Sequence, residues 1–367
     1  MQQTPLILQH RAAGAKLVDF AGWEMPIQYT GVVDEYQTVR CKAGLFDVSH
    51  MGRIEVSGSG AESFLQRMTT NDLAALKPLH AQYSMVCNGQ GGIKDDIFVY
   101  RLARAGEFLL CVNASNRDKV LSWLREHSQA FPDCHISDRS AEIAQIALQG
   151  SAARSIVAAL GLIELDHLKL RESTTLRIGD VECLAARTGY TGEFGYEFYV
   201  YGQASTVWER LLDTGKSFGL KPAGLGARDL LRLEMGYLLY GNDIDEGTTP
   251  IEAGAEWAVN FEKGEFLGKT VLTAQLQAGV SRRFVGFELL EKGVPRHGFK
   301  ILSSSPPQSP IGEVTSGNLS PLLQKGIGLG YVSPAYMKPG TDVMIDIRGK
   351  MVPARIVKPP FYRRPSK

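Results

Sequence analysis

The sequence predicts an α+β protein in which two mixed units precede an all-β region. Strand-like stretches and amphipathic helices follow one another twice between residues 53 and 215. Near Gly279 the composition changes, and short apolar stretches then alternate with turn-forming residues while helical periodicity almost disappears. Mixed elements that each bury one face are expected to pack in layers, whereas short strands separated by turns are typical of a small barrel or sandwich.

The length of the chain predicts a folded protein of two or three domains, and its near-neutral charge gives no sign of a strongly charged partner. The chain has 367 residues, enough for cores that bury most of its apolar surface. Its formal net charge is +1, with charged residues at 22%, so no overall field favours nucleic acid or a membrane surface. Electrostatic recognition is therefore expected to be local.

Cysteine usage and the N-terminal residues predict a cytoplasmic protein of a prokaryotic kind. The five cysteines are odd in number, widely spaced and without a C-x-x-C pair, which favours reduced thiols over disulfides or a thiolate zinc site. The first residues have neither the charged and apolar regions of a signal peptide nor the Arg-rich character of a transit peptide. No apolar run approaches the roughly 20 residues that a bilayer span needs.

Periodicity assigns the elements of the first region in chain order. A strand-like piece at 18–26 is followed by helical spacing at 33–43, which Gly44 is expected to end. Strands are expected at 53–57 and 108–112, and helices at 61–68 and from 113 to about 127. Ser115 or Asn116 is the expected N-cap of the last helix.

The same periodicities continue to the end of the chain. The second round comprises strands at 141–150 and 196–200, one or two strands within 176–187, and helices at 151–160 and 204–215. The all-β region shows apolar stretches at 284–290, 300–302, 311–315, 328–332 and 343–347. Residues 303–310, with two consecutive prolines, are expected to form a hairpin loop because proline cannot donate to a strand ladder.

The most strongly marked turn lies at residues 88–92, between two alternating apolar runs. Asn and Gly tolerate positive φ, so this stretch predicts a hairpin. Asp95 and Asp96 then open the second strand, and a side-chain period of two sends them to opposite faces. A solvated pair at a strand start is the simplest interpretation, and the alternative is that one acid faces a site that the sheet covers.

Common nucleotide, metal and nucleophile motifs are not found. Residues 264–270 imitate a phosphate loop with one residue too few between the glycines, and 224–229 lacks the third glycine of a dinucleotide fingerprint. The seven histidines form no H-x-x-x-H or H-x-H cluster, and no G-x-S-x-G elbow is present. A triad from distant residues stays open, while residues 47–50 are expected to form a polar turn that satisfies its own backbone.

Three segments combine polar side chains with tight turns, at 187–197, 227–236 and 240–250. Each is equally compatible with an ion-paired helix surface or a solvated loop. Taken with the Asp95–Asp96 turn, they outline a cleft lined by carboxylates, guanidiniums and tyrosines.

Seven motifs follow one another along the chain: VDFAGWEMP at 18–26, LFDVSHM at 45–51, GGIKDD at 91–96, RTGYTGE at 187–193, GLGARD at 224–229, LYGNDIDE at 239–246 and TSGNLSP at 315–321. In this order they resemble the T protein family of the glycine cleavage system, the tetrahydrofolate-dependent aminomethyltransferases. The resemblance runs from Thr4 to about Tyr362.

The resemblance implies a three-domain cloverleaf of two α+β folate-binding units and a C-terminal β-barrel. Residues 1–278 would hold the two interleaved α+β units and residues 279–367 the barrel. The implied reaction releases ammonia from the aminomethyl group on the dihydrolipoyl arm of H protein and gives 5,10-methylenetetrahydrofolate. Tetrahydrofolate is then a co-substrate, no metal, flavin or nucleotide is needed, and the protein is expected to be a monomer that binds H protein transiently.

The resemblance also implies roles for individual residues. Asp96 matches the family's catalytic aspartate, Glu197 matches the acid that binds the pterin, and Arg228 matches a folate-site arginine. The positions that line the pocket are Met51, Tyr83, Asn113 and Tyr190. Arg363, in the C-terminal Pro-Phe-Tyr-Arg motif, would meet the glutamate tail of folate or belong, with Arg364, to a solvated basic tail.

Two other functions share the implied architecture. A folate-dependent demethylase of the sarcosine or dimethylglycine type usually carries a flavin domain, for which this chain has neither the length nor a fingerprint. A non-catalytic folate-binding protein implicated in iron–sulfur cluster maintenance carries a motif cysteine, and Tyr190 stands in the comparable stretch here. Both alternatives therefore rank behind the aminomethyltransferase.

Overall fold

The structure is a computed structural model that describes residues 1–364 and divides into two compact units. Unit 1 comprises Met1–Val86 with Asp95–Asp229. Unit 2 comprises Cys87–Lys94 with Leu230–Lys367, of which residues up to 364 are described. The domain boundary predicted between residues 278 and 279 stays a prediction.

Unit 1 is built on two large sheets and a small one. The first has the strand order β11 (Ser173–Ile178), β12 (Val181–Ala186), β13 (Gly195–Tyr201), β10 (Ala144–Gln149), β4 (Ala43–Asp47) and β14 (Leu220–Pro222). Its strands pair antiparallel, except for β4 and β14, which are parallel.

The second sheet carries the hairpin that the sequence marks most strongly. Its strand order is β6 (His80–Cys87), β7 (Ile93–Arg101), β8 (Glu107–Val112), β5 (Gly52–Ser57) and β9 (His135–Asp138). The small third sheet has the order β1 (Gln2–Gln3), β3 (Trp23–Gln28) and β2 (Lys16–Phe20).

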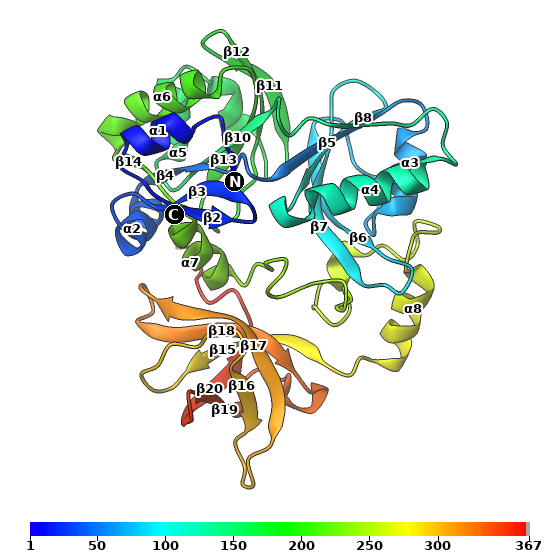
Figure 1. The fold of residues 1–367 in the computed structure, drawn as a ribbon, viewed down its shortest axis with the longest axis vertical. Coiled ribbons are helices and arrows are strands. Elements are labelled where there is room, and N and C mark those ends of the chain that lie inside the picture. The colour runs from blue at the N-terminus through cyan, green and yellow to red at the C-terminus, as the bar shows by residue number, and fades with distance from the viewer. Residues whose placement is uncertain (365–367) are drawn as a thin grey trace. The chain divides into compact units, whose positions relative to one another are not determined.

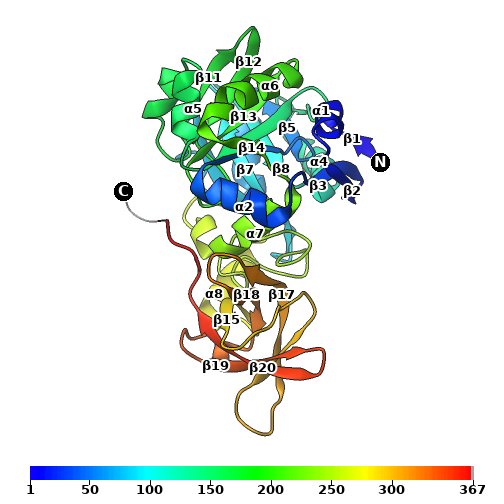
Figure 2. The ribbon, with the colours of Figure 1, turned by 90° about the vertical axis from the view of Figure 1, so that its left-hand side faces the viewer.

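Helices cover the large sheets. The core of the six-stranded sheet includes buried side chains of α5 (Ala153–Ala159) and α6 (Ala204–Gly215), and Figure 2 shows both helices beside β13. Figure 1 shows α3 (Ala61–Met68) and α4 (Arg117–Ser128) beside the five-stranded sheet. The remaining helices that lie wholly within unit 1 are α1 (Ile7–Ala12) and α2 (Val32–Cys41).

The two large sheets share one apolar cluster. Its buried members come from β6, β7 and β8 of one sheet and β12 and β13 of the other, with Ile143 from the connection before β10: Ala81, Tyr100, Leu109, Cys111, Ile143, Leu184, Ala186 and Tyr199. Burial of this kind contributes about 25 cal/mol per Å² of apolar surface, so the cluster fixes the strands that carry the site.

Unit 2 contains a closed barrel, one of the two architectures that the sequence left open. Its strand order is β15 (Arg283–Leu289), β18 (Lys325–Val332), β17 (Pro310–Ser320), β16 (Lys300–Ser303), β19 (Asp342–Ile347) and β20 (Lys350–Val357). Closure leaves no unpaired edge, which removes a common route to aggregation. Unit 2 also holds α8 (Lys269–Ala278), while α7 (Leu225–Met235) includes residues of both units.

The hairpin turn at 88–92 is confirmed, whereas the end predicted for the helix at 33–43 is wrong. The Asn88 side chain accepts from the backbone N–H groups of Gln90 and Gly92, which closes the turn. In contrast, α2 ends at Cys41, and Gly44 lies inside the buried strand β4. A Cβ at Gly44 would lie 2.5 Å from Val39 Cγ2, so glycine is needed there for close packing of helix on strand.

Within residues 1–364, no helix combines the length and the apolar character that a membrane crossing requires.

Candidate functional site

Asp96 lies at a half-buried position of β7, next to one polar side chain from β6 and one from the residue that follows β8. Burial alternates along this strand, so Asp95 faces the interior and Asp96 the more open side. Tyr83 Oη on β6 donates to Asp96 Oδ2 at 3.0 Å, and Asn113 Nδ2 donates to Asp96 Oδ1 at 2.8 Å. The carboxylate is therefore held by hydrogen bonds on both oxygens.

Asp95 is fully buried and is the centre of a hydrogen-bonded cluster. Its Oδ2 accepts from the backbone N–H of Asn113 at 2.9 Å. Its Oδ1 accepts from Nδ2 of Asn113 at 2.8 Å and from Nδ2 of Asn116 at 2.6 Å. Burial, and then the charge of Asp96, raises the pKa of Asp95 to about 8.

Asn116 takes the expected N-cap position of α4 but does not act as a cap. Its side chain makes no capping hydrogen bond, because its amide donates to Asp95 instead. Asn113 stands in extended backbone between β8 and the short 3-10 helix 114–116, which brings its amide close to β7. The stretch predicted as one helix is thus a 3-10 turn followed by α4, bent around the carboxyl group of Asp95.

Aromatic rings connect Asp96, on the five-stranded sheet, with the six-stranded sheet. Tyr83 meets Phe98 edge-on at 5.7 Å between ring centroids, and Phe98 lies 6.4 Å from Tyr100. Burial, and then the charge of Asp96, holds the pKa of Tyr83 well above its usual range, so its hydroxyl stays a donor at neutral pH. Tyr83 and Phe98 are only partly buried, so their faces suit stacking against a heteroaromatic ring.

Glu197 lies on β13, at the other end of these rings. One oxygen accepts from the Thr188 hydroxyl, and the other accepts from Gln145 Nε2 at 3.3 Å. Thr188 Oγ1 lies 3.3 Å from the hydroxyl of Tyr100, so polar and aromatic contacts connect Glu197 with the aromatic residues next to Asp96. Gln145 was missed by the sequence analysis above, because a single glutamine in a buried strand belongs to no motif.

Arg228 and Tyr190 form a stacked pair. The guanidinium carbon lies 4.7 Å from the centroid of the Tyr190 ring. Arg228 Nη1 is buried and has no hydrogen-bond partner among the described residues. A buried donor without a partner costs about 1–3 kcal/mol, which supports a position for an acceptor atom of a ligand or a water molecule.

The loop that carries Tyr190 is fixed by a buried ion pair. Arg40 Nη1 lies 2.8 Å from Glu193 Oε1, with 5% and 1% of the two side chains exposed. The same nitrogen donates to the carbonyl oxygen of Thr191 at 2.8 Å. Arg40 of α2 therefore fixes the position of the loop that carries Tyr190.

Met51 packs against the apolar cluster between the two sheets, beside Tyr100 and Tyr199. Its neighbour His50 is almost completely buried, and its Nδ1 has no hydrogen-bond partner among residues 1–364. Burial, and then the positive charge of Arg228, lowers the pKa of His50 to about 3. His50 is therefore a neutral ring, whereas the sequence predicts only that it belongs to a polar turn.

The structure brings seven of the eight expected site residues into unit 1, and it joins Asp96, Tyr83 and Asn113 directly by hydrogen bonds. Arg363 belongs to unit 2 and is exposed. The chain just before it is anchored, because the backbone N–H groups of Phe361 and Tyr362 donate to the carbonyl oxygen of Glu234.

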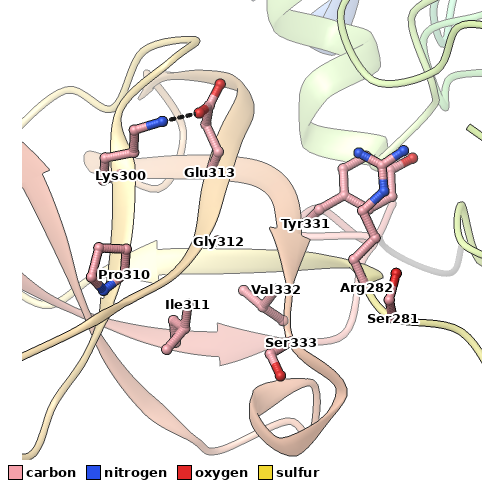
Figure 3. Close-up of a pocket in the computed structure, with 10 residues that line it drawn as sticks. All are labelled: Ser281, Arg282, Lys300, Pro310, Ile311, Gly312, Glu313, Tyr331, Val332 and Ser333. Atoms are coloured by element: carbon pink, nitrogen blue, oxygen red, sulfur yellow. Dashed lines mark hydrogen bonds and ion pairs between the residues drawn. The ribbon is translucent and has the colours of Figure 1, made fainter. Parts of the chain in front are cut away.

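A separate hollow in unit 2 has a volume of about 340 Å³ and is lined by barrel residues (Figure 3). Lys300 and Glu313 pair with each other on one side of it. On the other side, Arg282 stacks on Tyr331 at 4.6 Å and pairs with Glu252 at 2.9 Å. The charged side chains that line this hollow are therefore paired with one another or with Glu252.

No group of three or more His, Cys, Asp or Glu side chains within residues 1–364 is arranged to hold a metal ion. The side chains around Asp96, Glu197 and Arg228 can act as acids or bases, form hydrogen bonds and stack against a flat ligand.

Two family models match the chain. The GCVT N-terminal domain matches residues 6–263, and the glycine cleavage T-protein C-terminal barrel domain matches residues 282–363. The chain is 45% identical over 362 residues to an aminomethyltransferase of Halothermothrix orenii, covering 98% of this chain and 100% of that one. It is 43% identical over 369 residues to an aminomethyltransferase of Bacillus subtilis, covering 99% and 100%.

Comparison of the fold with solved structures also points to aminomethyltransferases. The crystal structure of the glycine cleavage system aminomethyltransferase T from Bartonella henselae matches with a TM-score of 0.91 and 36% identity, over 99% of this chain and 98% of that one. Mixed α/β layers, a closed six-stranded barrel and these relatives define an enzyme of the aminomethyltransferase class. The chain belongs to the glycine cleavage T-protein family and is an aminomethyltransferase of the glycine cleavage system.

Proposed function

We propose that the enzyme acts on the aminomethyl group carried by the dihydrolipoyl arm of H protein. It releases ammonia and transfers the one-carbon unit to tetrahydrofolate, which gives 5,10-methylenetetrahydrofolate. The observation that carries this proposal is the Asp96 carboxylate, held on both oxygens by Tyr83 and Asn113 beside a series of aromatic rings.

Asp96 would act as the catalytic carboxylate. In this reaction an amine of the folate attacks a carbon that gains iminium character as ammonia leaves. A fixed carboxylate next to these atoms orients the amine, balances the developing positive charge and moves protons. Because Asp96 is already held by two donors, little reorganisation is needed when the charge develops.

Glu197 would bind the pterin. The pterin ring presents a ring N–H and an exocyclic amine side by side, and a carboxylate accepts such a pair well. Thr188 and Gln145 fix the Glu197 carboxylate in one orientation, as a binding group of this kind requires.

Arg228, Tyr190 and Met51 would form the remainder of the folate pocket in unit 1. The buried Nη1 of Arg228 has no described partner and would donate to an acceptor atom of folate. Tyr190 and Met51 would supply flat or polarizable surface against the aromatic parts of the ligand. Arg363 would meet the glutamate tail, and its exposed position equally suits a solvated basic tail.

Tetrahydrofolate is thus proposed as a co-substrate and H protein as a transient partner, with the enzyme itself a monomer in the cytoplasm. No metal, flavin or nucleotide takes part in the proposed reaction.

The direct test uses purified enzyme, aminomethyl-loaded H protein and tetrahydrofolate. The proposal predicts equal yields of ammonia and 5,10-methylenetetrahydrofolate, with neither product when folate or the loaded carrier is left out. Folate binding without turnover would favour a non-catalytic folate-binding protein. One-carbon transfer from sarcosine or dimethylglycine to folate, in place of the loaded carrier, would favour a demethylase.

A further inference from the structure

Asp95 is a buried carboxyl group for which the family resemblance supplies no role. Its exposed fraction is 0%, so it is not the solvated acid that a strand start alone suggests. It accepts two hydrogen bonds from Asn113 and one from Asn116. Buried carboxyl groups persist when they are hydrogen-bonded, and here the donors lie directly beside Asp96.

One nitrogen connects Asp95 with Asp96. Nδ2 of Asn113 lies 2.8 Å from Oδ1 of Asp95 and 2.8 Å from Oδ1 of Asp96. The same nitrogen lies 3.1 Å from the carbonyl oxygen of Asp96. Asp95 also accepts from the backbone N–H of Asn113, so it holds that residue at two points and fixes the direction of its amide.

We propose that Asp95 is a positioning residue, which clamps Asn113 so that the amide of Asn113 holds the carboxylate of Asp96 in its reactive direction. The proposal rests on the proposed catalytic role of Asp96. Asn116 completes the clamp, because its amide donates to Asp95 Oδ1 at 2.6 Å and keeps that oxygen in place.

The electrostatic surroundings agree with this arrangement. With a pKa of about 8, Asp95 holds its proton over most of the neutral range, so that the pair avoids two adjacent carboxylate charges. Tyr83 on β6 interacts with both acids, and burial and then Asp96 raise its pKa; Tyr190 in turn influences Tyr83. Asn113 and Asn116 carry no charge.

The test compares Asp95→Asn, Asn113→Ala and the double variant in the complete reaction with loaded H protein. Asp95→Asn keeps the side-chain volume but turns an amide toward the donors of Asn113. We expect kcat to fall about tenfold in each single variant, while KM for tetrahydrofolate stays within about threefold. The double variant is expected to be no slower than the slower single variant, because both changes break the same connection.

Asp47→Asn is the matched control. Asp47 is an equally buried carboxylate of unit 1, and it pairs with His10 at 2.8 Å. This control is expected to lower thermal stability but to keep kcat, once rates are normalised to the folded fraction from near-UV circular dichroism. If Asp95→Asn does not fold, Asn116→Ala decides the question, because it removes a donor to Asp95 and leaves the hydrogen bond from Asn113 to Asp96 in place. A fall in kcat supports the proposal, and an unchanged kcat overturns it.

A pH profile separates positioning from a purely structural role. The wild-type kcat is expected to change near pH 8, where Asp95 ionises, and this change is absent from Asp95→Asn. An unaltered profile and an unaltered kcat in Asp95→Asn would overturn the proposal. Asp96→Asn, assayed in parallel, identifies which claim fails: if it keeps the full rate, the role of Asp96 is wrong and the positioning proposal falls with it.

Discussion

Glu197 illustrates how a single carboxylate can select a ligand through the donors that it accepts. In Glu197→Gln the shape is kept, but an amide donor then faces the proposed N–H groups of the pterin. We expect tetrahydrofolate binding to weaken by about 1–3 kcal/mol in titration calorimetry. Glu182→Gln, on an exposed position of β12, is the control and is expected to change nothing. Unchanged affinity in Glu197→Gln would exclude Glu197 from the folate site.

His50 gives a second prediction at the residue scale, because its pKa of about 3 lies well below the ordinary value of 6.5. The unfolded chain then binds a proton between pH 6.5 and 3 that the folded chain does not. The resulting stability is complete above pH 6.5 and is lost as pH falls toward 3, by up to about 4–5 kcal/mol.

The measurement is urea unfolding of wild type and His50→Gln between pH 7 and pH 4. The variant is expected to lose less stability over this range than the wild type, whatever its stability at pH 7. Parallel pH dependences in the two proteins would show that His50 takes up its proton as readily in the folded chain as in the unfolded one.

Glu35 connects two elements by accepting only backbone donors. Its Oε1 accepts from the N–H groups of Tyr29, Thr30 and Gly31, before α2, and its Oε2 accepts from Gly224 at 2.8 Å, before α7. Arg228 lies in the first turn of α7. By holding the residue before this helix, the Glu35 carboxylate therefore helps to fix the position of the Arg228 side chain.

Glu35→Gln should therefore loosen the entry to α7. An amide nitrogen would face the N–H of Gly224, and we expect the free energy of unfolding to fall by about 1–3 kcal/mol. Chemical denaturation provides the value, with Glu182→Gln again as the control. A denaturation midpoint equal to that of the wild type would mean that the four donors find other partners.

Sequence periodicity and turn residues predicted most of the strands and helices, including the buried strands β10 and β13, but missed β4. The hairpin at 88–92 and helices such as α6 follow directly from turn residues and amphipathic spacing. The strand β4 was not predicted, because all five of its residues are buried and it begins close to the end of a helix. The sequence predicts Gly44 as the residue that ends this helix. A fully buried strand has no polar face, so its sequence carries no period of two.

At the scale of the whole molecule, a formal net charge of +1 leaves no long-range field to attract a carrier protein. Recognition is then expected to depend on local charges, with weak association that salt weakens further. Raising the salt from about 50 to 300 mM should increase the KM for loaded H protein several-fold while kcat stays constant. A tight complex that survives chromatography at high salt would contradict this expectation.

The motifs predicted which residues to examine, but not how they are held. Asp96 and Glu197 lie in recognisable stretches, whereas their supports come from distant positions: Asn116 was expected to cap a helix, and Gln145 has no motif at all. Such partners depend on how strands of two sheets come together, which a local pattern does not encode. Arg363 lies in unit 2, and its role stays a prediction.

The central claim is that Asp96 is the catalytic carboxylate of an aminomethyl transfer to tetrahydrofolate. The most direct measurement is kcat for Asp96→Asn with loaded H protein, alongside the tetrahydrofolate affinity of the same variant and kcat for Asp95→Asn. We predict a loss of roughly 10²–10⁴-fold in kcat for Asp96→Asn, much less weakening of folate binding, and a far smaller loss for Asp95→Asn. Equal losses for the two substitutions, or an Asp96→Asn enzyme at nearly full rate, would contradict the claim.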